Sequence, residues 1–185
     1  MSELDTPKTE FSGPHHGCPM SIPHTHGLKC VSDGYVLDRL VLTDEVISEL
    51  IVFLMSEQSD YRQFAARNLH DAPPDLVVSH LQEALRREMD AFTAGLIISA
   101  LGTLKLPLII PAIERWVARA DEAFIAHNIM ESYLQLLMVI DCGEIGRDTN
   151  CITIGRTLAK LSQSKDQIVA QEAKRILDLF GLSGE

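Results

Sequence analysis

The sequence predicts an all-α fold made of repeated helix pairs, and three observations predict it. From Leu42 onward the apolar residues recur at spacings of three and four, which is the period of amphipathic helices. Residues that commonly cap helices stand in front of the apolar stretches. The stretches themselves repeat at intervals of 31 or 32 residues. We therefore expect one helical domain over residues 41–185, preceded by an irregular arm over residues 1–40.

The arm has no helical period. It holds four of the eight prolines, Pro7, Pro14, Pro19 and Pro23, together with several glycines. Near its end, the Asp33-Gly34 pair is flanked by apolar residues, which indicates a short hairpin. We expect this segment to lie outside the helical core.

Eight helices are expected in the domain. In chain order they cover about 43–56, 59–70, 74–88, 90–104, 107–119, 121–138, 150–163 and 165–180. Side chains able to cap the first turns are Thr43 or Asp44, Ser59, Asp90 and Asp121. Pro74 and Pro107 fit the first position of a helix, and Gly102 and Gly181 suit helix ends.

The helices align with one another as pairs. Aligning the second, fourth and eighth helices places three leucines together, Leu69, Leu101 and Leu177. The helices that follow the second and fourth align Leu81 with Ile113 at an offset of 32 residues. A single helix pair cannot bury its apolar face alone, so such units stack and leave an extended surface. A generic helical bundle is the alternative interpretation.

Three landmarks mark these pairs: an Asp that opens the first helix, small residues in its middle with Leu101-Gly102 near its end, and Pro107-x-x-Ile110-Pro111 at the start of the second helix. With them, residues 43–181 resemble the HEAT-like repeat family, in particular the short repeats of phycobilisome-lyase-type proteins. The arginine of the family's first helix is present as Arg62. The resemblance implies a right-handed α-solenoid that holds partners and performs no chemistry.

Composition and motifs narrow the classes of function. The 16 Lys and Arg against 26 Asp and Glu give a formal charge of −10, which argues against nucleic acid or an anionic membrane as the partner. The apolar runs 50–55 and 96–101 are much shorter than the roughly 20 residues that span a bilayer. No phosphate-binding loop, hydrolase elbow or zinc-protease motif is present, so we do not expect an enzyme.

The N-terminus shows no apolar stretch typical of a secretory signal, so a reducing cytoplasmic location is expected. In that compartment the four cysteines should be free thiols or metal ligands. We expect Cys142 and Cys151 to be buried or idle thiols.

The arm carries a cluster of metal-ligating residue types. Cys18, His24, His26 and Cys30 offer two thiolates and two imidazoles, the ligand set of a closed tetrahedral zinc site. The sequence thus predicts one bound zinc, ahead of iron or copper. The alternatives are a histidine-rich arm that binds metal adventitiously, and a tail whose histidines are hydrogen-bonded to the helices.

A partner surface follows from the repeat register. The resemblance implies that the second helices of the pairs line the concave side. The 32-residue offset places Glu83 beside Arg115 and Arg87 beside Arg119, and aligning the seventh helix adds Lys160. Trp116 would stand at the edge of this strip as an anchor. The alternative is an ordinary solvated face with Trp116 in the core.

Three functions are compatible with these features. The first is a non-enzymatic adaptor, assembly factor or subunit that binds another protein. The second is a protein that handles a metal or cofactor carried by the arm. The third, suggested only by the repeat subfamily, is a lyase-like protein that attaches a chromophore.

Overall fold

The computed structural model describes residues 42–119, 122–140 and 148–182, and all regular secondary structure in these residues is helical. The α-helices are α1 (Asp44–Leu54), α2 (Ser59–Asn68), α3 (Pro74–Arg87), α4 (Ala91–Thr103), α5 (Ile110–Glu114), α6 (Ala123–Leu137), α7 (Thr149–Leu161) and α8 (Gln167–Leu179). Three short 3₁₀ helices are η1 (Leu69–Asp71), η2 (Pro107–Ile109) and η3 (Val117–Arg119). The predicted all-α class is confirmed for this part of the chain, whereas the arm and its expected hairpin lie outside it.

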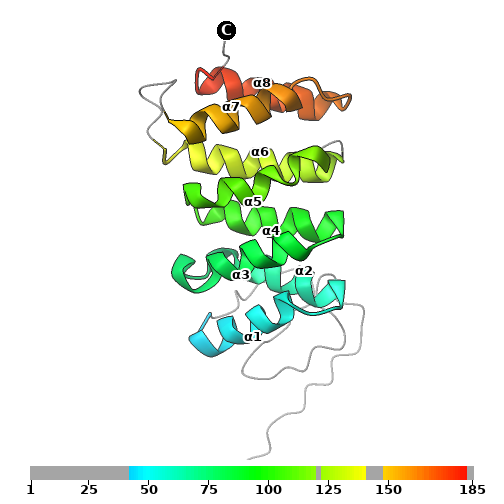
Figure 1. Ribbon diagram of the computed structural model, residues 1–185, viewed down its shortest axis with the longest axis vertical. Helices are drawn as coiled ribbons and strands as arrows, with labels where there is room; N and C mark the ends of the chain where they lie inside the picture. Colours follow the sequence, from blue (N-terminus) through cyan, green and yellow to red (C-terminus); the bar gives the residue numbers. More distant parts are fainter. Residues whose placement is uncertain (1–41, 120–121, 141–147, 183–185) are drawn as a thin grey trace, which may run out of the picture.

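The helices follow one another along the long axis of the molecule and alternate between two layers (Figure 1). Helices α1, α3, α5 and α7 form the front layer of Figure 1, and α2, α4, α6 and α8 form the back layer. Within each layer a helix packs against the helix two places along the chain, and α4 and α6 make the most extensive contact. Among the described helices, none has the length and apolar character needed to cross a membrane.

The helix starts explain why these segments fold where they do. Thr43 and Asp90 accept backbone N–H groups of Val46 and Thr93, as expected. Asp148 and Asp166 cap α7 and α8 in the same way. The expectation for Ser59 was wrong, because Ser59 is the first residue of α2 and the preceding Gln58 makes no side-chain cap. Asp121 lies outside the described residues.

The two glycines expected at helix ends differ. Gly181 follows α8 with a φ of 62°, and the Leu182 N–H reaches back to the Leu177 carbonyl at 2.8 Å, which is the expected C-terminal cap. Gly102 is the next-to-last residue of α4, near the helix end as expected, and a Cβ there would stand 2.7 Å from the Cα of Ser132 on α6. Gly102 therefore also permits close packing of α4 against α6.

The segment expected as one helix over 107–119 is broken into η2, α5 and η3. Pro107 and Pro111 each lack a backbone N–H and each opens a short element, so a continuous α-helical ladder is interrupted there. The break turns the segment without moving it out of the front layer (Figure 1).

Cys151 corrects another expectation. It is buried at the first turn of α7 and is disulfide-bonded, so it is not the idle thiol that we expected. Four cysteines permit three pairings, and spacing alone does not choose among them or against free thiols. Cys142 lies outside the described residues.

Candidate partner-binding site

The predicted metal ligands Cys18, His24, His26 and Cys30 lie outside the described residues. Within residues 42–119, 122–140 and 148–182, no three His, Cys, Asp or Glu side chains are grouped so that they could hold a metal ion. The zinc site on the arm therefore stays a prediction.

The end of α3 places two of the expected surface residues together with one that sequence reasoning missed. Glu83 forms ion pairs with Arg86 at 2.6 Å and with Arg87 at 2.5 Å. The hydrogen bond from Arg86 is the main reason that the pKa of Glu83 falls to about 2, assisted by Arg87. One carboxylate thus lies between two guanidinium groups, and this end of α3 keeps a net positive charge.

The end of α5 and the second half of α7 continue this charge. Arg115, the residue after α5, is exposed and forms no ion pair with any described residue. On α7, exposed Lys160 donates to the Val117 carbonyl at 3.4 Å, which holds it against η3. Arg156 lies one turn before Lys160 and is also exposed. We call Arg86, Arg87, Arg115, Arg156 and Lys160 the cationic strip.

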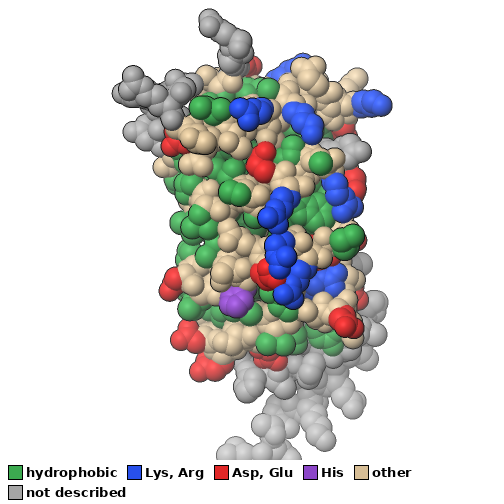
Figure 2. Space-filling model, in the orientation of Figure 1, with side chains coloured by type: hydrophobic (Ala, Val, Ile, Leu, Met, Phe, Trp, Pro, Cys, Tyr) green, Lys and Arg blue, Asp and Glu red, His purple; other side chains and the backbone are tan. Residues whose placement is uncertain are grey.

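Basic side chains gather over α3, α5 and α7 on one face of the molecule (Figure 2). Sequence reasoning found three members of the strip, and it missed Arg86 and Arg156. Both could have been found from helical spacing, because Arg86 is three residues from Glu83 and Arg156 is four residues from Lys160.

Trp116 lies in the core, as in the alternative interpretation of the sequence, and does not stand at the edge of this surface as an anchor. Its ring is buried, and its indole N–H donates to the Leu85 carbonyl of α3 at 3.3 Å. The guanidinium of Arg119 lies over the ring, 4.7 Å from its centroid, and also donates to the Met89 carbonyl and to Glu122. Trp116 and Arg119 therefore join neighbouring front helices. Burying the large apolar ring in the core is more favourable than exposing it at the rim of the surface.

A hollow of about 330 Å³ lies between α3 and the η2–α5 segment. It is lined by Ser79, Gln82, Glu83 and Arg86 on one side and by Leu108, Pro111, Ala112 and Arg115 on the other. Its volume is at the lower end of the range for ligand pockets. The hollow thus joins part of the cationic strip to apolar side chains.

A second polar cluster lies between the layers and has a different role. Glu114 of α5 accepts hydrogen bonds from the hydroxyl groups of Tyr133 on α6 and Thr157 on α7. Burial, and then the carboxylate of Glu114, raise the pKa of the Tyr133 phenol well above its usual value. The phenol stays protonated and donates a hydrogen bond to Glu114, so the cluster ties α5, α6 and α7 together.

The chain was also compared with known proteins. No protein-family model, curated protein or solved structure matches it.

Proposed function

We propose that this chain is a non-enzymatic adaptor that binds another protein through the face formed by α3, α5 and α7. In this proposal the stacked helix pairs are a short right-handed solenoid of the HEAT-like type. The supporting observation is the cationic strip, to which three successive front helices contribute exposed Arg or Lys side chains. On a chain with a formal charge of −10, such a segregated row favours a role in recognition over a role in stability.

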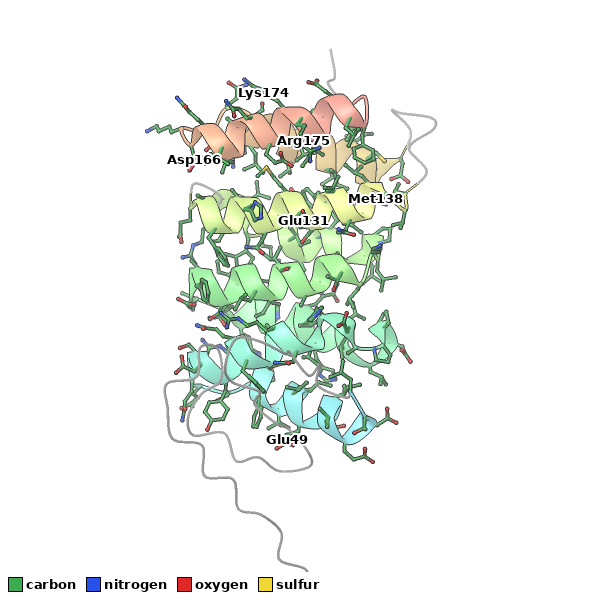
Figure 3. All side chains as sticks on the ribbon, turned by 180° about the vertical axis from the view of Figure 1, so that it is seen from behind. Glu49, Glu131, Met138, Asp166, Lys174 and Arg175 are labelled. Carbon is green, nitrogen blue, oxygen red and sulfur yellow. The ribbon has the colours of Figure 1, made fainter. Side chains whose placement is uncertain are left out.

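The decisive comparison is between two double charge reversals. The strip variant is Arg86→Glu with Arg115→Glu. The control is Arg175→Glu with Lys174→Glu, on α8 of the back layer (Figure 3). Arg86 and Arg175 are closely matched, because each pairs with a glutamate three residues earlier at 2.6 Å and their side chains are 54% and 55% exposed. Arg115 and Lys174 are both exposed and form no ion pair within the described residues.

Tagged wild-type and variant chains would be used to capture partners from extracts of the native host. We expect the strip variant to lose the wild-type partner and the control to retain it, with closely similar melting temperatures, because exposed ion pairs contribute only about 0–1 kcal/mol. Retention of the partner by the strip variant, or its loss from both variants, would contradict the proposed surface.

A further inference from the structure

The front surface carries an apolar row beside the cationic strip. Leu76 of α3, Leu108 of η2 and Ile152 of α7 are 39%, 54% and 43% exposed. Each lies near the start of its segment, and a charged residue follows further along the same segment. Leu76 is seven residues before Glu83, Leu108 seven before Arg115, and Ile152 four before Arg156. Each of three successive front segments therefore exposes an aliphatic side chain near its start and a charged side chain closer to its end.

The two rows meet in the hollow between α3 and the η2–α5 segment. Leu108, Pro111 and Ala112 give it an apolar wall, whereas Arg86 and Arg115 give it a basic rim. The Gln82 amide donates to the Leu108 carbonyl at 3.0 Å, so the two sides are held together. An aliphatic side chain that enters the hollow would lie within reach of guanidinium groups on either side.

We infer that the occupant of this surface is an acidic segment of a partner protein, with at least one aliphatic or aromatic residue between its carboxylates. The inference rests on the proposed function and names its partner class. Arg115 has no carboxylate partner among the described residues, and a free guanidinium binds a carboxylate through two parallel hydrogen bonds. Glu83 compensates one of its two neighbouring arginines and leaves the other charge for a ligand.

The apolar row is what separates an acidic protein segment from a nucleic acid. A phosphate backbone would use the arginines but would leave Leu76, Leu108 and Ile152 in water. A short peptide that carries both carboxylates and apolar side chains satisfies both rows at once.

A random 12-residue peptide library displayed on phage tests the inference with the purified full chain. We expect the enriched peptides to carry two or more Asp or Glu residues around an aliphatic or aromatic residue. Synthetic versions should bind about tenfold more weakly or worse to Arg115→Glu, which removes a charged hydrogen bond, and to Leu108→Asp, which places a carboxylate in the apolar wall. The Arg175→Glu control should bind within about twofold of wild type, and added salt should weaken binding.

Four results would overturn this partner class. The first is enrichment of neutral or basic peptides whose binding still depends on Arg115, and the second is acidic peptides that bind Arg115→Glu as well as they bind wild type. The third is a single-stranded oligonucleotide that binds more strongly at the same residues. The fourth is no enrichment of peptides above an uncoated surface. The first of these leaves the proposed adaptor surface in place. That surface fails separately, if the captured partner is insensitive to the strip variant.

Discussion

Arg62 is the side chain whose surroundings differ most from those of an ordinary surface arginine. Its Nε donates to Glu88 Oε2 at 2.7 Å and its Nη2 to Oε1 at 3.0 Å. Its Nη1 donates to the carbonyls of Ser56 and Glu57. The Glu88 side chain is only 2% exposed. The pair therefore joins the turn between α1 and α2 to the turn between α3 and α4.

The charge on Glu88 depends on these contacts. Burial by itself raises the pKa of the Glu88 carboxyl, but the hydrogen bonds from Arg62 and from the backbone N–H groups of Asp90 and Met89 outweigh it, so the pKa is lowered overall. Glu88 is thus ionised at neutral pH, and Arg62 is its nearest compensating charge.

Replacing Arg62 should destabilise the fold strongly. At pH 7 we expect Arg62→Ala to lower the free energy of unfolding by about 3–5 kcal/mol, because it leaves a buried carboxylate without its ion-pair partner. Urea denaturation followed by circular dichroism measures the loss. The deficit relative to wild type should narrow as the pH falls from 7 through about 4. The lowered pKa of Glu88 contributes stability above its unfolded value, and that contribution is lost in acid.

Arg175→Ala removes the matched exposed ion pair and should change the free energy of unfolding very little at any of these pH values. Equal losses for the two variants, or a deficit of Arg62→Ala that grows in acid, would contradict the buried ion pair as the cause.

At the scale of the elements, the contact between α4 and α6 depends on small residues. A Cβ at Gly102 would lie 2.4 Å from the Ser132 Oγ and 2.7 Å from the Ser132 Cα. The Ser132 hydroxyl is itself buried and donates to the Ile98 carbonyl at 2.9 Å. A Cβ at Gly102 could be accommodated only if the Ser132 hydroxyl lost its hydrogen bond and the backbone of α6 moved away from α4.

Gly102→Ala should therefore lower the free energy of unfolding by about 1–3 kcal/mol, the usual cost of overpacking a core. Gly155→Ala on α7 is the control, since a Cβ there meets only Leu182 at 3.7 Å or more. Alanine is favoured over glycine inside a helix by up to about 1 kcal/mol, so the control should be neutral or stabilising. Urea denaturation of both variants measures the difference, and the same sign for both would argue against close packing at Gly102.

The sequence predicted these elements better than their contacts. Apolar spacing and capping residues placed the helices within a few residues, except over 107–119, because both signals are local in the chain. The contacts of Gly102 with Ser132 and of Trp116 with Leu85 were not predicted, because these partners lie 30 and 31 residues away and no local pattern reports them. Part of the cationic strip was predicted, because the charge of each residue is known from the sequence, whereas the ion pairs between side chains are not.

For the whole molecule, stacking in chain order makes stability uneven. Helix α4 is surrounded by α2, α3 and α6, whereas α8 packs mainly against α6 and α7 at one end of the stack (Figure 1). Local opening costs least where a helix has few neighbours. In hydrogen–deuterium exchange followed by mass spectrometry, we expect peptides from α4 to exchange slowest and those from α8 markedly faster. Uniform protection across the helices would instead indicate a single cooperative unit.

The cationic strip lies on a chain whose formal charge is −10. Such an uneven distribution gives the molecule an electric field that attracts an acidic partner on one side and repels it elsewhere. The proposed acidic partner would therefore be turned toward α3, α5 and α7 before contact, which would raise the association rate and make it sensitive to ionic strength. The apolar row acts later and at short range, so it governs how long the complex lasts. In this proposal the cationic strip sets the association rate, and the apolar row of the same surface sets the lifetime of the complex.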